Sequence, residues 1–210
     1  MTNEGVSWDN GKGYKGIICS LVNLNFGDAM RVITGKAGGK KISAPEGLDV
    51  RPTPERVKEG IFSAIQFDIE GRRVLDLFAG SGQLGIEALS RGAMSATFVD
   101  SSASSIKFIR SNLEATGLMD SAKVVSGDYA SFLAMTRDTF DIAFLDPPYG
   151  AGLFEKALEK CTSVMSDYGI ILLEHPKEIS VPNEAGDFAV SKEYRYGKVL
   201  VTCYRRKEKI

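Results

Sequence analysis

The chain has 210 residues and a mass of 22.8 kDa, enough for one sizeable core with an appendage but too short for two comfortable cores. Hydrophobic residues make up 43% and charged residues 25%, which indicates a globular protein and excludes disordered, collagen-like and membrane classes. The net charge of −1 by itself predicts no polyanion partner, so any nucleic-acid site must rest on where the charges lie.

The N-terminal third predicts a leader followed by a basic appendage. Residues 1–29 are rich in glycine and asparagine without sustained periodicity, and we expect them to be a disordered leader. Two short β-like runs, 31-RVITG-35 and 40-KKISA-44, predict a hairpin. Thr53 and Pro54 predict the N-cap and first position of a helix that continues to residue 67. We therefore expect residues 30–70 to form an extension before the main domain, residues 71–210.

From Gly71 onward, apolar strand-sized runs alternate with helical patterns. Apolar strands in such an alternation predict a parallel sheet covered by helices on both faces, a Rossmann-like α/β fold. Runs 188–196 and 198–206, separated by Gly197, predict an antiparallel hairpin that brings the sheet to seven strands. The expected strands are 73–78, 95–100, 122–127, 140–145 and 168–174, and the expected helices lie near 83–91, 103–116, 129–136 and 152–165.

A glycine-rich loop follows the first strand of this alternation. Gly80, Gly82 and Gly85 form a GxGxxG pattern within 76-DLFAGSGQLGIEALSRG-92. Glycines let the backbone approach a ligand closely, and the following helix N-terminus offers N–H groups without helical partners. The pattern fits NAD, FAD or S-adenosylmethionine, and packing alone could also explain it.

Acidic residues recur at the predicted strand ends. Asp76 lies within the end of the first strand, Asp100 ends the second, and Asp128 follows the third. Open α/β sheets bind ligands at this edge, where an acid about 20 residues after the first glycine meets a cofactor ribose. Asp100 would serve a dinucleotide equally well, and Asp128 alone could be an ordinary turn or capping residue. Three acids at one edge nevertheless predict a ligand site.

The fourth strand ends in the corner 146-DPPY-149. Pro147 and Pro148 fix two φ angles and remove two backbone donors, which leaves acceptors beside the Asp146 carboxylate. Tyr149 adds a flat ring. Two acceptors and a stacking surface suit a planar base that carries an exocyclic amino group.

Together these segments resemble a known family. The stretches "DLFAGSG" at 76–82 and "DPPY" at 146–149 are similar to those of class I S-adenosylmethionine-dependent amino-methyltransferases. "RPTPERVKEGIFSAI" at 51–65, "GQLGIEALSRGA" at 82–93 and "YGKVLVTCYRR" at 196–206 narrow the resemblance to the RsmD-type family, which methylates a guanine 2-amino group in small-subunit (16S) ribosomal RNA. The resemblance runs from about Met30 to Arg206.

The resemblance implies a site for S-adenosylmethionine and a base-methylating mechanism. Asp146 and the Pro147 carbonyl would accept the two hydrogens of the amine, Tyr149 would stack on the base, and Asp146 or water would take the departing proton. The implied cofactor contacts are Asp76, Phe78, Ala79, Gly80, Gly82, Asp100, Ser101, Asp128, Tyr129 and Asp146.

A target base must leave its stack to reach such a site, so cations must hold the RNA phosphates. Residues 30–58 carry seven basic and three acidic side chains, a local excess that the total charge hides. Arg195, Arg205 and Arg206 form a weaker second group. The predicted RNA contacts are Arg31, Lys36, Lys40, Lys41, Arg51, Thr53 and Arg56.

Three alternatives remain open from the sequence. The amine-directed corner could act on DNA or another RNA, since "DPPY" indicates an exocyclic amine and not the polymer. A nicotinamide-dependent oxidoreductase would use the same glycines but leaves the corner unexplained. A catalytically silent RNA-binding module would not bind the cofactor. Three scattered cysteines without CxxC spacing predict no metal site and a reducing, cytoplasmic location, and we expect a monomer.

Overall fold

The computed structural model describes residues 30–44, 54–148 and 152–207. Its strands are β1 (Arg73–Asp76), β2 (Ser95–Asp100), β3 (Ala122–Ser126), β4 (Phe140–Leu145), β5 (Met165–Pro176), β6 (Glu184–Ala185), β7 (Phe188–Tyr196) and β8 (Val199–Arg206). Its helices are α1 (Glu55–Ala64), α2 (Gln83–Ser90), α3 (Ala103–Thr116), α4 (Tyr129–Met135) and α5 (Leu153–Thr162), with a short 3₁₀ turn, η1 (Met119–Ser121).

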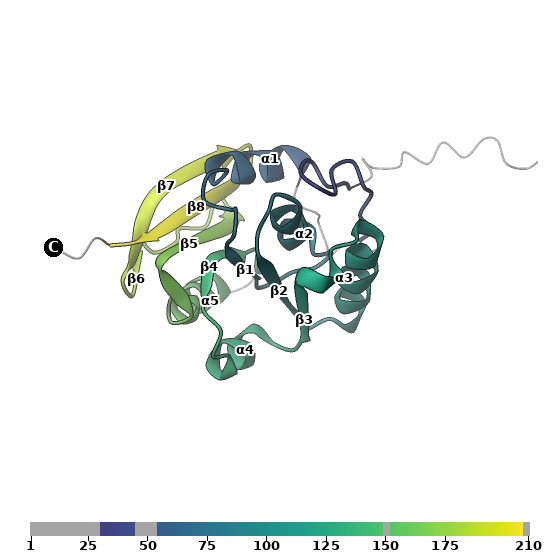
Figure 1. Ribbon diagram of the computed structural model, residues 1–210. Coiled ribbons are helices and arrows are strands. Elements are labelled where there is room, and N and C mark those ends of the chain that lie inside the picture. The colour runs from purple at the N-terminus through teal and green to yellow at the C-terminus, as the bar shows by residue number, and fades with distance from the viewer. Residues whose placement is uncertain (1–29, 45–53, 149–151, 208–210) are drawn as a thin grey trace, which may run out of the picture.

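All the strands join one sheet in the order β3-β2-β1-β4-β5-β8-β7-β6 (Figure 1). Strands β1 to β5 are parallel, so their carboxyl ends meet at one edge of the sheet, which we call the carboxyl edge. The opposite edge, where these strands begin, is the amino edge. The expected α/β fold with a mostly parallel sheet is confirmed.

The C-terminal strands run antiparallel to the rest. β8 is inserted between β5 and β7, so the predicted hairpin extends the sheet beyond β5. The sheet has eight strands instead of the expected seven, because β6 pairs with the start of β7 through Glu184↔Ala189 and Ala185↔Phe188. A strand of two residues is too short to show the alternation on which strand prediction depends.

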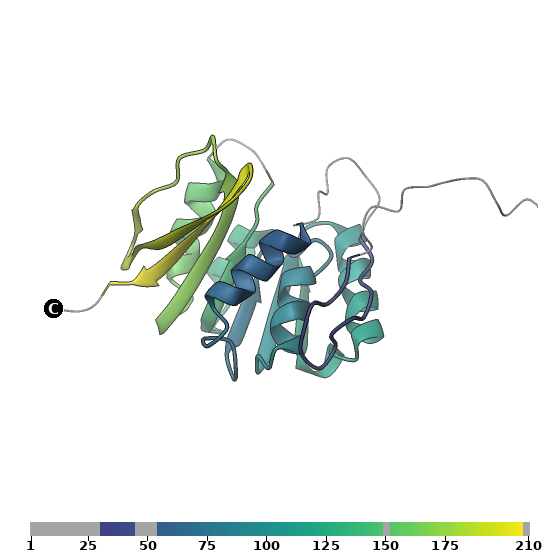
Figure 2. The same ribbon diagram turned by 90° about the horizontal axis from the view of Figure 1, so that it is seen from above.

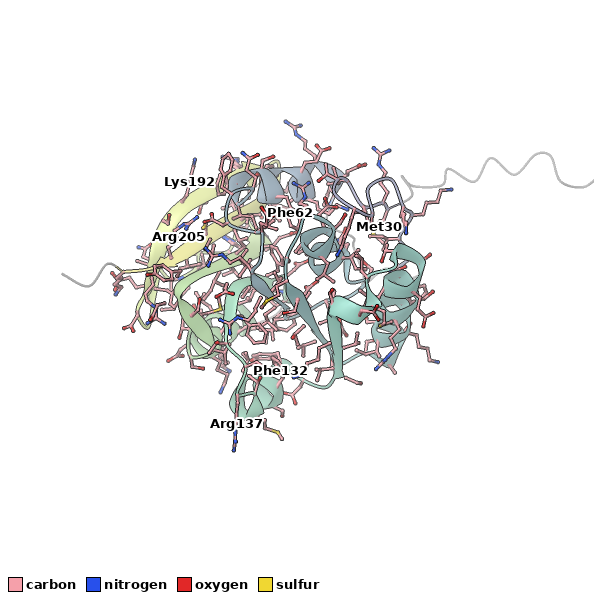
Figure 3. The ribbon with its side chains drawn as sticks, viewed as in Figure 1. Met30, Phe62, Phe132, Arg137, Lys192 and Arg205 are labelled. Carbon is pink, nitrogen blue, oxygen red and sulfur yellow. The ribbon has the colours of Figure 1, made fainter. Side chains whose placement is uncertain are left out.

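Helices cover both faces of the sheet, and each face has its own apolar core (Figures 1 and 2). One core joins α1, α2 and α3 to the sheet, and the other joins α4 and α5 to it. The ring of Phe62 on α1 lies 5.5 Å from that of Phe144 on β4, and Figure 3 shows Phe62 beneath the helix. This contact fixes α1 over the strand that leads to Asp146.

The N-terminal segment is built into the main core. Residues 30–44 form a single antiparallel bridge between Arg31 and Lys41 instead of a regular hairpin. Val32, Ala37 and Ile42 are buried in the core that includes α1, α2 and α3. The helix expected from Pro54 begins one residue later, at Glu55, with Pro54 at the N-cap position. Thr53, the predicted cap, lies outside the described residues.

Candidate active site

Asp76 is a buried carboxyl at the carboxyl end of β1. It is 4% exposed, and its Oδ2 accepts a hydrogen bond from the Gly85 backbone N–H at 2.9 Å. Burial first of all, and then the nearby charges of Asp146 and Asp100, raise the pKa of Asp76 to about 7 against the opposing effect of that hydrogen bond. The predicted carboxylates of β1, β2 and β4 therefore lie close enough to influence one another.

The three glycines of the loop have different roles. Gly80 and Gly82 have φ angles of +54° and +79°, which side-chain-bearing residues rarely adopt. A Cβ atom at Gly85 would lie 2.3 Å from the Phe98 ring, so this glycine lets α2 pack closely on β2. A Cβ atom at Gly80 would meet no described residue beyond its chain neighbours within 4 Å. The open side of Gly80 can accept a ligand against the backbone.

Asp100 is held in a fixed orientation at the end of β2. Its Oδ2 accepts from the Gly80 N–H and its Oδ1 from the Ser102 N–H, each at 2.8 Å. Ser102 also caps α3 by accepting from the Ser105 N–H, while Ser101 is exposed. A carboxylate has about four acceptor positions, so both oxygens can still accept from ligand hydroxyls.

Asp128 caps the N-terminus of α4, as in the alternative that this residue is an ordinary capping residue. Its Oδ1 accepts from the N–H groups of Ala130 at 3.0 Å and Ser131 at 2.9 Å. Hydrogen bonds from Ser131, first of all from its side chain, lower the pKa of Asp128. The following residue, Tyr129, lies with its ring 5.2 Å from that of Phe78. Two aromatic side chains, one from the turn after β1 and one from the start of α4, therefore meet at the carboxyl edge.

The 146–148 corner lies beside the glycine loop. The Phe144 carbonyl accepts from the Leu77 N–H at 3.0 Å, so β4 stays paired with the chain that leads into the loop. Ala79 is held from the other side by the Val99 carbonyl, also at 3.0 Å. Asp146 is half-buried and Pro147 is buried, while Tyr149 lies outside the described residues.

The predicted RNA contacts separate into two groups. The turn that carries Lys36 and Lys40 reaches the amino edge: the Lys36 N–H bonds the carbonyl of Ser90, the last residue of α2, and Lys40 Nζ bonds the Thr116 carbonyl at the end of α3 (Figure 2). Arg31 pairs with Glu55 in the first turn of α1 at 2.8 Å.

Lys41, the bridge partner of Arg31, and Arg56 are exposed. Lys41 lies two residues before Ser43, which Asn112 joins to Ser81 of the glycine loop. Arg56 lies in the first turn of α1, the end farther from the start of β1. Both therefore lie toward the carboxyl edge. Arg51 lies outside the described residues.

Sequence reasoning missed the polar residues that connect the N-terminal segment to the site. Glu87 on α2 is fully buried and accepts from the N–H groups of Ile33 at 2.7 Å and Thr34 at 3.1 Å. Its other partners are Arg91 at 2.7 Å and the buried Lys58 at 3.9 Å. The sequence did carry one signal for this role, since Glu87 stands among the apolar residues of α2.

Asn112 on α3 was missed as well. Its amide nitrogen donates to the carbonyls of Ser43 at 2.7 Å and Ser81 at 2.9 Å, and its Oδ1 accepts from the Ser43 N–H at 2.9 Å. Ser81 belongs to the glycine loop. One side chain therefore connects α3, the loop and the N-terminal segment.

A separate hollow of about 410 Å³ lies at the amino edge. Two of its cations are already paired, Arg73 with Asp141 at 3.2 Å and Lys123 with Asp138 at 2.7 Å. It is remote from the carboxyl ends of the strands and contains none of the predicted site residues.

A parallel sheet extended by antiparallel strands, with a glycine loop and carboxylates at its carboxyl edge, defines the class I methyltransferase fold. The family model described as "Conserved hypothetical protein 95" matches residues 30–205. The chain belongs to this family, the RsmD-type family of class I S-adenosylmethionine-dependent methyltransferases.

Relatives and solved structures agree with this assignment. The chain is 39% identical over 187 residues to "Putative rRNA methyltransferase YlbH" of Bacillus subtilis, covering 85% of this chain and all of that protein. It is 34% identical over 179 residues to "Ribosomal RNA small subunit methyltransferase D" of Escherichia coli, covering 84% of this chain and 90% of that protein. The structure titled "Putative methyltransferase yhhF from Escherichia coli" superimposes with a TM-score of 0.75 at 33% identity, covering 86% of this chain and 99% of the chain of that structure.

Within the described residues, no helix is long and apolar enough to cross a membrane. The same residues contain no cluster of three or more His, Cys, Asp or Glu side chains that could hold a metal ion.

Proposed function

We propose that this protein transfers a methyl group from S-adenosylmethionine to the exocyclic 2-amino group of a guanine in small-subunit ribosomal RNA. The observation that carries the proposal is the meeting of Asp146 and Pro147 with the glycine loop and Asp76 at one edge. A cofactor loop alone fits several enzyme classes, whereas the adjacent acceptor corner is specific to an amine substrate. The relatives' names support ribosomal RNA as the polymer.

The residues at the carboxyl edge fit the cofactor. The open side of Gly80 admits a ligand, and Asp100 presents two fixed oxygens suited to ribose hydroxyls. Phe78 and Tyr129 offer apolar surface for the adenine ring. When bound, S-adenosylmethionine would supply a methyl group activated by its positively charged sulfur, which would leave as a neutral thioether as the bond to nitrogen forms.

Asp146 and Pro147 orient the substrate amine. The guanine amine is a weak nucleophile because its lone pair is delocalised into the ring. Acceptors at the Asp146 carboxylate and the Pro147 carbonyl take one N–H each, which favours a pyramidal nitrogen whose lone pair points toward the methyl donor. Tyr149 stacks on the base, and Asp146 or a water takes the proton. Positioning is the main contribution of these residues.

RNA contacts complete the proposal. Of the basic residues in the N-terminal region, the placement favours Arg31, Lys41 and Arg56, which lie toward the carboxyl edge. Lys36 and Lys40 lie at the opposite edge and are left out.

The test is mass spectrometry of nucleosides from small-subunit ribosomal RNA incubated with the protein and S-adenosylmethionine. We expect 2-methylguanosine with the wild-type protein and none with Asp146→Ala, whose affinity for the cofactor should stay within about tenfold. Asp120→Asn, an exposed acid just before β3 at the amino edge, is the matched control and should retain activity. Methylation at another atom would refute the assignment of the target amine, and loss of cofactor binding in Asp146→Ala would make Asp146 a cofactor or folding residue.

A further inference from the structure

The turn between β7 and β8 stands at the same edge as the candidate active site. We call residues 194–198 the hairpin tip. Pro176, the last residue of β5, pairs with Val199, which pairs with Tyr196. On β5, Leu173 is level with Leu145 at the end of β4. With strands ~4.8 Å apart and ~3.3 Å per residue, the tip lies roughly 10–15 Å to the side of Asp146 and about 7 Å beyond it.

The tip and the strand that leads to it carry cations and aromatic rings together. Lys192, Arg195 and Lys198 are exposed, and Glu193 is the one acid between residues 191 and 198. Lys192 Nζ lies 5.0 Å from the centre of the Tyr194 ring, which is half-buried. A cation beside a tyrosine face is the chemistry that binds single-stranded RNA, through phosphate contacts and base stacking.

Ion pairing distinguishes the tip from the other arginines of the C-terminal strands. Arg205 is paired with Asp68 at 2.9 Å and Arg206 with Asp187 at 3.0 Å. Among the residues that the structure describes, neither Arg195 nor Lys198 has a carboxylate within ion-pair distance. Arg195 and Lys198 can therefore meet a phosphate without first breaking an ion pair to a described residue.

The tip is held firmly against α1. A Cβ atom at Gly60 would lie 2.0 Å from the Tyr196 hydroxyl, so the tyrosine lies directly on the helix backbone. The Lys177 N–H also bonds the Lys198 carbonyl at 3.0 Å, which joins the tip to the chain after β5. Figure 3 shows Lys192 beside α1 and directed outward. The tip is therefore packed against α1 at Gly60, one helical turn after the exposed Arg56.

We infer that the hairpin tip is a second RNA-binding surface, which holds the phosphates of nucleotides flanking the target guanine. The inference rests on the proposed function. A base drawn out of its stack leaves its flanking phosphates outside the site, where cations must hold them. Arg31, Lys41 and Arg56 can hold phosphates near the start of α1, and Arg195 and Lys198 supply further cations at the β7–β8 turn of the same edge.

The test compares two double variants that each remove one arginine and one lysine. Arg195→Gln with Lys198→Gln changes the tip, whereas Arg137→Gln with Lys160→Gln removes the same charge from exposed positions just after α4 and in the last turn of α5. Figure 3 places Arg137 far from Lys192. Binding to protein-free small-subunit ribosomal RNA is measured across a salt series, together with melting temperature and cofactor affinity.

We expect the tip variant to bind RNA about tenfold more weakly, with the slope of log K against log salt reduced by ~1.5, since each phosphate contact contributes ~0.7–0.9. The control variant should match the wild type, and cofactor affinity should stay unchanged in both. Glu193→Gln raises the net charge of the same strand and should tighten RNA binding, a gain that a folding defect cannot produce.

The outcomes separate this inference from the proposed function. If the wild type methylates the RNA but the tip variant keeps its slope and affinity, the inference is overturned and the function stands. If the wild type forms no 2-methylguanosine, the function fails whatever the tip does. If the tip variant loses affinity for the assembled small subunit but not for protein-free RNA, the tip contacts a ribosomal protein, which also overturns the inference.

Discussion

The buried carboxyl of Asp76 makes stability depend on pH in a way that Asp76→Asn should remove. Burial raises its pKa from the usual 3.8 to about 7, so between these values the folded protein keeps a proton that the unfolded chain releases. The contribution of Asp76 to the free energy of unfolding is therefore fully present below pH 3.8 and is lost as the pH rises toward 7. At about 1.4 kcal/mol for each pH unit, the loss is on the order of 4 kcal/mol by pH 7.

Asparagine does not titrate and can still accept the hydrogen bond from the Gly85 N–H. We expect Asp76→Asn and the wild type to have similar unfolding free energies near pH 4. At pH 7 and above, the unfolding free energy of the variant should be higher than that of the wild type by up to about 4 kcal/mol. Urea denaturation of both proteins at several pH values measures the difference, with the exposed Asp120→Asn as control.

A difference between Asp76→Asn and the wild type that stays constant from pH 4 to 8 would refute the reasoning. Because Asp76 is also a proposed cofactor contact, calorimetry should show weaker S-adenosylmethionine binding by the more stable variant, the trade-off expected of a residue kept for function.

Three further changes test the packing and the RNA contacts. Gly85→Ala places a methyl group against an aromatic ring 2.3 Å away, so it should lower stability by about 1–3 kcal/mol in urea denaturation; an unchanged midpoint would contradict this close packing. Glu87→Ala leaves the buried Lys58 without its carboxylate and should cost about 3–5 kcal/mol, with faster hydrogen exchange in residues 30–44; exchange unchanged there would disprove the anchoring role. Lys41→Ala should lower the salt slope of RNA binding by about one, whereas Lys36→Ala, at the amino edge, should not; the reverse result would invert the proposed placement.

The order and type of the main elements were predictable because each depends on local signals. The strand 95–100, the helix 103–116 and the strand 140–145 are found within the predicted limits. Their hydrophobic periods and end signals, such as the Gly117 that ends α3 with a φ of +73°, act over a few residues. The two-residue β6 and the short η1 gave no such period and were missed.

Much of the candidate site was also predictable, because strand direction puts the ends of parallel strands together. Once the alternation of strands and helices was recognised, Asp76, Asp100 and Asp146 had to share one edge. The sequence could not indicate that Asp100 holds the loop through the Gly80 N–H, or that burial raises the pKa of Asp76, since both depend on the packed surroundings.

By itself the sequence determined the α/β alternation, the glycine loop and the acidic corner, since these follow from residue types that are close together along the chain. Only the tertiary structure decided that Glu87 anchors the backbone of Ile33 and Thr34, contacts that span more than 50 residues. It alone decided, through the antiparallel pairing of β8 with β5, that the hairpin tip meets the carboxyl edge. Such contacts arise from burial and strand register across the whole fold, which no local pattern specifies.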